Sequence, residues 1–294
     1  MRYRITHKTS YSYSEPVAVC HNLARLAPRT NRWQRPEFFR LNIFPTPTDL
    51  RERVDAFGNH VHYFSIQEAH RALTLNAISE MEITPLDDPP PGAPWEDVRD
   101  SLNQRDRGQL APPLLPRYSS ALAPTSPEYA HYALKSFTPR RPIVDAMQDF
   151  SSRIHEDFQY DPVATTVTTP VRTVFEQRAG VCQDFAHVAI ACLRSIGLAA
   201  EYVSGYLRTF PPPGKPRLVG ADASHAWLSL YCGDLGWIDA DPTNALLPRA
   251  DHVTIAVGRD YADVCPIQGV YVGGGENTMT VAVDVAEVSE GGNP

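Results

Sequence analysis

The chain has 294 residues, of which 43% are hydrophobic and 21% charged, and its formal net charge is −7. This composition is typical of a globular, water-soluble protein of one large or two ordinary domains. The acidic balance argues against nucleic acid or an anionic membrane as a partner. No apolar stretch approaches the ~20 residues of a membrane-spanning helix. The sequence gives no indication of the oligomeric state.

The cysteines and the first residues bear on the compartment. Five cysteines are an odd number scattered along a long chain, which argues against a disulfide framework. Residues 1–17 alternate like a strand and lack the apolar core of a secretion signal. We therefore expect a cytoplasmic protein.

The first half of the chain divides into two parts. Residues 1–84 alternate apolar and polar side chains over short runs separated by turn residues, which predicts a small β-sandwich-like domain. Residues 85–142 hold twelve of the 27 prolines and predict an extended connector without long regular elements. Within it, residues 126–137 can form a short helix.

The pattern changes at Ile143. Helical spacing is found over residues 143–160, 169–180 and 182–196. The strand-like runs that follow cover residues 199–207, 224–232, 236–241 and 278–288. Helices followed by a sheet predict an α+β domain over residues 143–294.

The segment 182–196 predicts an unusual helix. Its apolar residues fill an arc of roughly 200°, so the helix should be largely buried. Cys182 is its first residue, where unpaired backbone amides and the positive end of the helix dipole stabilise a thiolate. The same amides can hold an oxyanion. Cys192, in contrast, lies mid-helix on the apolar arc and is expected to pack in the core.

A zinc site on this helix is excluded by geometry. Cys182, His187 and Cys192 are spaced by five residues, which places them roughly 140° apart around the helix. Three such side chains cannot converge on one ion. We expect no metal and no cofactor.

A thiol nucleophile needs a base and a group that orients the base. His225 begins a strand-like run and shares its less apolar face with Trp227; the alternative interpretation is a half-exposed strand histidine. Asp239 and Asp241 share the next strand's Trp237 face. Alternation leaves open which of them would orient the imidazole.

At this point the sequence resembles a known family. "GVCQDFAHVAIACLRSIGLAAEYVSGYL", "ASHAWLSLY" and "GWIDADPTN" resemble the three motifs of the transglutaminase-like superfamily, and residues 1–84 resemble the β domain of its bacterial branch. The resemblance implies a papain-like core in which the cysteine-bearing helix packs on an antiparallel sheet. It also implies Cys182 as nucleophile, His225 as base and Asp241 as the residue that orients His225.

The implied chemistry is acyl transfer or hydrolysis at amide bonds of a peptide or protein, through a thioester on the cysteine. Hydrolysis by a peptidase or amidase is slightly favoured over cross-linking. Gln183 stands where the animal enzymes have tryptophan, and Tyr160, Gln183 and Trp227 are candidates for the oxyanion or substrate pocket. The alternative function is a binding or scaffolding module that retains the fold without turnover.

Overall fold

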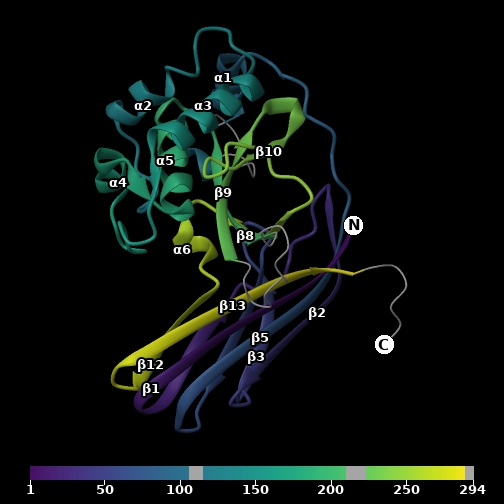
Figure 1. Cartoon of the computed structure of the whole chain (residues 1–294), viewed down its shortest axis with the longest axis vertical. Helices are drawn as coiled ribbons and strands as arrows, with labels where there is room; N and C mark the ends of the chain where they lie inside the picture. The colour runs from purple at the N-terminus through teal and green to yellow at the C-terminus, as the bar shows by residue number, and fades with distance from the viewer. Residues whose placement is uncertain (106–114, 210–222, 289–294) are drawn as a thin grey trace, which may run out of the picture.

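A computed structural model describes residues 1–105, 115–209 and 223–288 of the chain. Long strands form its lower half in Figure 1, and helices with shorter strands form its upper half. None of the helices in the described ranges is long and apolar enough to cross a membrane.

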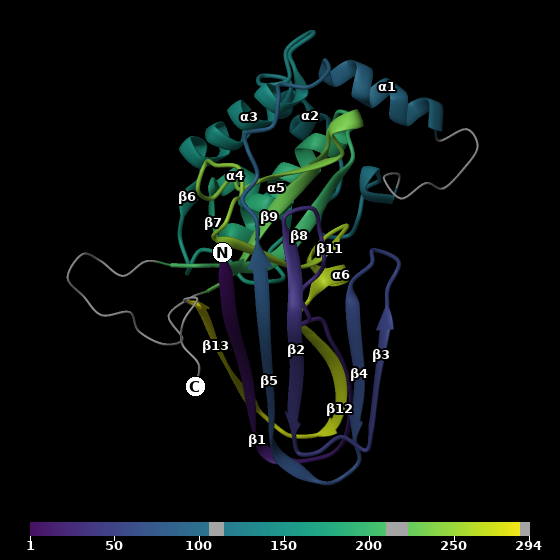
Figure 2. The ribbon, with the colours of Figure 1, turned by 90° about the vertical axis from the view of Figure 1, so that its right-hand side faces the viewer.

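The lower half is a seven-stranded antiparallel sheet, whose strands lie side by side in Figure 2. Five of the strands are β1 (Arg2–Ala24), β2 (Gln34–Phe44), β3 (Asp49–Val54), β4 (His60–Ile66) and β5 (His70–Ile83), in the order β2-β5-β1-β4-β3. Burial alternates along β5, as the sequence predicts for a half-buried strand. The N-terminal region is thus β-rich, as predicted, and built as a curled sheet.

The last two strands of the chain complete this lower sheet. β12 (Ile267–Gly273) and β13 (Asn277–Glu287) both pair antiparallel with β1. The 23 residues of β1 are long enough to pair with β5 and β13 along one half and with β4 and β12 along the other. The sequence predicts a strand over residues 278–288, within the second domain, and none over residues 267–273; alternation can reveal a strand but not its partner.

The connector is more regular than the prolines suggest. It holds α1 (Trp95–Arg105), a 3₁₀ turn (Leu115–Arg117) and α2 (Pro127–Ala133). The short helix α2 was predicted, but α1 was not. None of the connector's prolines lies within α1, so they do not interrupt this helix, and Trp95 and Val98 are buried against the core.

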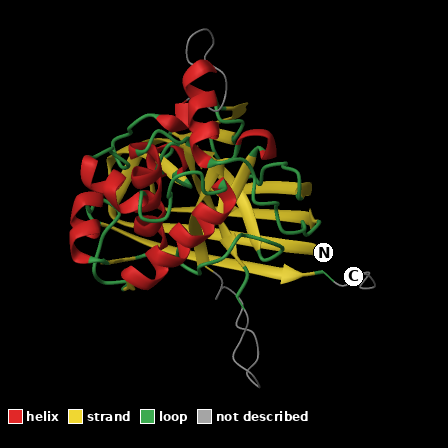
Figure 3. Cartoon of the chain, turned by 90° about the horizontal axis from the view of Figure 1, so that it is seen from above, coloured by secondary structure: helices red, strands yellow, loops and turns green. Residues whose placement is uncertain are grey.

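The upper half contains four further helices, a four-stranded antiparallel sheet and a short parallel pair of strands. The helices are α3 (Ile143–Asp157), α4 (Val171–Gln177), α5 (Cys182–Ser195) and α6 (Tyr261–Val264). The sheet, in the order β10-β9-β8-β11, comprises β8 (Ala200–Leu207), β9 (Ala223–Tyr231), β10 (Trp237–Ala240) and β11 (His252–Gly258). The parallel pair is β6 (Gln159–Tyr160) with β7 (Ala179–Gly180). Seen from above, the helices lie together and the long strands extend from beneath them (Figure 3).

Helix α5 packs on β8 and β9, so the predicted arrangement of a buried helix on an antiparallel sheet is confirmed. Two polar residues of α5 are buried as well, since His187 is 4% and Arg194 3% exposed. The Arg194 guanidinium donates to the backbone carbonyls of Pro116, Ala200 and Arg259 at 2.6–2.8 Å. These carbonyls compensate the buried charge, which sequence periodicity cannot reveal.

Two side-chain amides join the lower half to the edge strand β11. Gln34 accepts from the N–H of Thr254 at 2.8 Å and donates to its carbonyl at 2.7 Å. Asn59 accepts from the N–H of Val257 at 2.9 Å and donates to its carbonyl at 2.8 Å. We call these four hydrogen bonds the amide clamps. They satisfy backbone groups that an edge strand otherwise leaves open.

Candidate active site

The first turn of α5 is fixed by a buried carboxylate. Asp184 accepts hydrogen bonds from the backbone N–H of Val181 at 2.9 Å and from the Thr165 hydroxyl at 2.6 Å. A side chain at Gly180 would place its Cβ 2.6 Å from a carboxylate oxygen of Asp184, so glycine is needed there. The sequence analysis missed Asp184, although an acidic residue three positions after a helix N-cap is a recognisable signal. These hydrogen bonds of Asp184 fix the first turn of α5, and with it the position of Cys182.

His225 lies on β9 and is only 9% exposed. The face that it shares with Trp227 and Ser229 is buried too, with Trp227 at 0%. Phe57 of the lower half packs against this face. The alternative of a half-exposed strand histidine is therefore wrong, because the N-terminal region covers the second side of the sheet.

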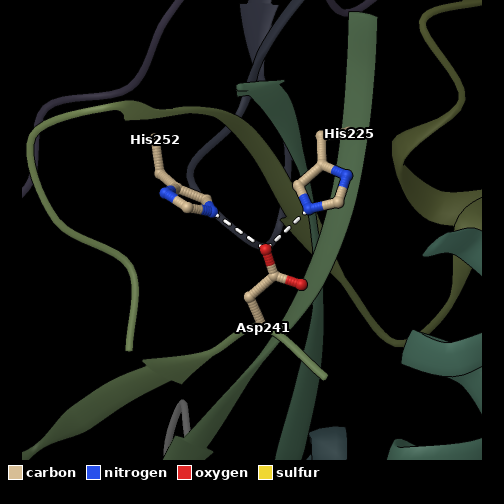
Figure 4. A group of neighbouring side chains, drawn as sticks. All are labelled: His225, Asp241 and His252. Carbon is tan, nitrogen blue, oxygen red and sulfur yellow. Dashed lines mark hydrogen bonds and ion pairs between the residues drawn. The ribbon is translucent and has the colours of Figure 1, made fainter. Parts of the chain in front are cut away.

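Asp241 follows β10 and is surrounded by hydrogen-bond donors. Its Oδ2 atom lies 2.7 Å from Nε2 of His225 and 3.0 Å from Nε2 of His252, and Figure 4 shows the carboxylate between the two rings. The Asn244 amide donates to the same oxygen at 2.7 Å, and the Thr243 N–H donates to Oδ1 at 2.9 Å. The carboxylate is completely buried and held from several directions.

These contacts shift the charges of the two central groups. Burial favours a neutral carboxyl at Asp241, but hydrogen bonds from His225 and His252 outweigh it and lower its pKa. Burial also lowers the pKa of His225, but hydrogen bonds with Asp241 and Cys182 raise it to about 9. The Nδ1 atom of His225 points away from Asp241 (Figure 4). At neutral pH an imidazolium thus lies between a carboxylate and the Cys182 side chain.

The two aspartates that the sequence left equivalent have different partners. Asp241 contacts His225, whereas Asp239 accepts from the indole N–H of Trp227 at 2.9 Å. Burial raises the pKa of Asp239, against hydrogen bonds from Ser229 and Trp227 that lower it. Of the two, Asp241 has the geometry to orient the imidazole.

The three pocket candidates lie in different surroundings. Tyr160 on β6 is 54% exposed and packs edge-on against Phe185 of α5. Burial, and then the charge of Cys182, raise the pKa of the Tyr160 hydroxyl. Gln183 is partly exposed. Trp227 is fully buried and bonded to Asp239, so it offers no surface to a substrate and supports the site from behind.

Within the described residues, one group of three possible metal ligands comes together: His225, Asp241 and His252, with donor atoms within 4.8 Å of one another. Both imidazole Nε2 atoms already bond to the same oxygen of Asp241. A metal would have to replace both hydrogen bonds in a closed, buried space. Cofactor-free acid–base chemistry fits this hydrogen-bonded arrangement better than metal ligation does.

Sequence reasoning also missed His252 and Asn244. The run Asp-Pro-Thr-Asn after a strand is typical of a turn in which the aspartate accepts backbone N–H bonds, and this signal was available. His252 carries no such signal. It begins β11, on the far side of β8 and β9 from β10, and only the fold brings it to Asp241.

The chain is similar to several known proteins. Residues 3–82 match a family described as "Bacterial transglutaminase-like N-terminal region", and residues 131–242 match one described as "Transglutaminase-like superfamily". The uncharacterized protein Rv2569c of Mycobacterium tuberculosis is 42% identical over 97% of this chain and 92% of its own length. A protein-glutamine gamma-glutamyltransferase of Pseudomonas aeruginosa is 31% identical over 38% of this chain and 17% of that protein.

A solved structure shares the fold. The crystal structure of a protein from Cytophaga hutchinsonii, described as a "Putative Cysteine Protease", matches with a TM-score of 0.75 and 20% identity. It covers 100% of this chain and 93% of the other. The likeness therefore extends over both halves of the molecule.

Proposed function

Because the chain belongs to the transglutaminase-like superfamily, we propose that it is a thiol-dependent enzyme acting on amide bonds of peptides or proteins. The fold shared with the Cytophaga hutchinsonii protein supports a thiol-dependent enzyme in general. One observation carries the finer proposal: His225 contacts the buried Asp241 and the Cys182 side chain at once.

In the proposed reaction, Nδ1 of His225 already holds the thiol proton of Cys182 in the resting enzyme, and the thiolate of this ion pair attacks the amide carbonyl carbon. Asp241 holds the imidazole in position through Nε2 and stabilises its positive charge. When the tetrahedral intermediate collapses, the C–N bond breaks and His225 returns the proton to the departing amine. A thioester between Cys182 and the acyl group remains.

Two donors suit the oxyanion of that intermediate. The backbone N–H of Cys182 lies in the first turn of α5, where amides have no partner inside the helix. The hydroxyl of Tyr160, whose side chain is exposed, is the second candidate. Gln183 next to the thiol is partly exposed and is a candidate for substrate contact.

The thioester can be resolved by water or by a second amine, and the same triad serves both. We favour water, and hence a peptidase or amidase, over cross-linking. We also propose a cytoplasmic location and a peptide or protein substrate, with no nucleic-acid or membrane partner. The five free cysteines and the net charge of −7 support these points.

The decisive experiment combines active-site labelling with product analysis. Iodoacetamide should label Cys182 much faster than Cys265, which is also partly exposed, and Cys182→Ala should remove the fast phase. A library of glutamine-containing and isopeptide-linked peptides is then incubated with and without a fluorescent primary amine. Release of free acid indicates hydrolysis, and incorporation of the fluorophore indicates transamidation.

Cys182→Ala should abolish either product. If Cys182 is labelled no faster than Cys265 and no peptide is converted, the chain is a binding module that keeps the fold without turnover. That result would refute the proposed enzyme.

A further inference from the structure

Asp241 is held by two histidines, and the proposed reaction uses only one of them. Nε2 of His252 lies 3.0 Å from the same Oδ2 atom that contacts His225. We propose that His252 is a positioning residue, which fixes the Asp241 carboxylate so that Asp241 in turn orients His225. The proposal rests on the proposed function, since it adds a fourth residue to that site.

His252 is itself held rigidly. It is 4% exposed, it begins β11, and its backbone N–H bonds to the carbonyl of Arg249 at 3.1 Å. Its ring meets the Trp227 indole edge-on with ring centroids 5.2 Å apart. Trp227 is held in turn by its hydrogen bond to Asp239. A buried ring with so little freedom can transmit its position to Asp241.

The hydrogen bond to Asp241 also defines which ring nitrogen of His252 carries a hydrogen. A carboxylate only accepts hydrogen bonds, so Nε2 of His252 must carry the hydrogen, and a neutral imidazole is sufficient. Donors from His225 and His252 then approach one oxygen from two sides, as Figure 4 shows. Asn244 and Thr243 still hold the carboxylate when the His252 donor is lost, but the loss shifts its balanced position, and a small shift is enough to misalign the imidazole that it orients.

Three substitutions separate this role from simple packing. His252→Leu removes the donor, and His252→Asn also removes it, because the shorter amide cannot reach Oδ2. His252→Gln keeps an N–H donor near the original position. The matched control is His7→Gln, since His7 is 2% exposed and its two side-chain hydrogen bonds go to Tyr206 and Thr9, which are not among the proposed site residues.

The first readout is steady-state kinetics on a peptide substrate. We expect His252→Leu and His252→Asn to lower kcat about 10–100-fold, as for outer-shell partners of ligating residues, with KM within about threefold. His252→Gln should recover kcat to within about threefold of wild type. His7→Gln should lower the melting temperature but leave kcat per folded molecule unchanged.

The second readout needs no substrate. In protein with ¹⁵N-labelled histidine, the N–H of His225 bonded to Asp241 should give a downfield, slowly exchanging proton resonance. This resonance should be lost in Asp241→Asn, His252→Leu and His252→Asn, and retained in His252→Gln and His7→Gln.

The two readouts decide different questions. If Cys182→Ala retains activity, the proposed function fails, and the His225 resonance still tests the role of His252. If the resonance and kcat survive in His252→Leu or His252→Asn, the positioning role is refuted. A His252→Gln variant as slow as His252→Asn, with the resonance in place, refutes it equally.

Discussion

The two faces of the four-stranded sheet are both buried, yet they differ in chemistry. On one face Ala226, Leu228 and Leu230 pack against α5 in a continuous apolar cluster. On the other face, His225 and Trp227 lie beneath the N-terminal region and are hydrogen-bonded to aspartates. The first face supplies hydrophobic stabilisation, and the second supplies fixed charges and dipoles.

The polar face also borders open space. Glu201, Ser229 and Asp239 are cross-strand neighbours on β8, β9 and β10, and they line a pocket of about 290 Å³. Burial raises the pKa of Glu201 to about 7, against the nearby Arg29, which lowers it. We therefore expect substitutions on the polar face to lower activity more than stability, and substitutions in the close-packed apolar face to lower stability.

The largest effect is expected from the two aspartates of the polar face. Asp241→Asn should lower kcat/KM at least ~10²-fold, because the amide no longer stabilises the imidazolium, and the analogous change in a serine triad costs about 10⁴. Asp239→Asn, which still accepts the Trp227 N–H, should stay within a few-fold of wild type. Steady-state kinetics with melting curves as a folding control measure both. A reversed ranking at unchanged stability would assign the orienting role to Asp239.

The apolar face should respond in stability instead. Leu228 is 1% exposed against α5, so Leu228→Ala should lower the free energy of unfolding by about 2–5 kcal/mol through lost burial and a residual cavity. Ser229→Ala, the next residue on the polar face, should cost only about 1 kcal/mol for its lost hydrogen bond to Asp239. Urea denaturation measures both. Equal losses would contradict the division between the faces.

Gly205 tests how closely the polar face is packed over β8. A Cβ at this position would lie 2.1 Å from the Val253 carbonyl oxygen and 2.5 Å from the Trp227 ring. Gly205→Ala should therefore lower the free energy of unfolding by about 1–3 kcal/mol. Ser204→Ala, one residue earlier and only partly buried, should change it by less than about 0.5 kcal/mol. Similar values for both variants would show that Trp227 can move aside.

The smallest effect concerns pH. The pKa of His225, about 9, is above its ordinary 6.5, so its stabilisation is complete below pH 6.5 and is lost as pH rises through 9. The pKa of Asp241 is lowered below its ordinary 3.8, so its contribution is present above pH 3.8 and is lost as pH falls below it. Urea denaturation from pH 5 to 10 should show the alkaline loss, and Asp241→Asn should flatten the curve.

Activity should follow the same ionisation. Above pH 9 His225 loses the proton that the departing amine needs, so kcat/KM should fall about tenfold from its neutral plateau by pH 10. A rate that stays constant up to pH 10 would show that the imidazolium at His225 is not required.

The sequence predicted local elements better than their partners. Helix α5 follows directly from a wide apolar arc that begins at Cys182, and the strand containing His225 follows from alternation. That both faces of this strand are buried could not be predicted, because a second layer of protein covers the side with polar residues. The contact of His252 with Asp241 depends on the fold alone, since β8 and β9 separate β11 from β10.

Through the amide clamps, the N-terminal region protects the edge strand β11 of the four-stranded sheet from pairing with other strands. Gln34 and Asn59 bond to backbone groups of β11 that could otherwise pair with a strand from another molecule. A shortened chain beginning after β5 would expose those positions, together with the apolar surface of Val253 and Ile255 that now packs against β1 and β5. Such a fragment would be prone to strand-by-strand self-association. Attempts to engineer a minimal catalytic fragment should therefore keep the N-terminal region, or replace β11 with a charged edge.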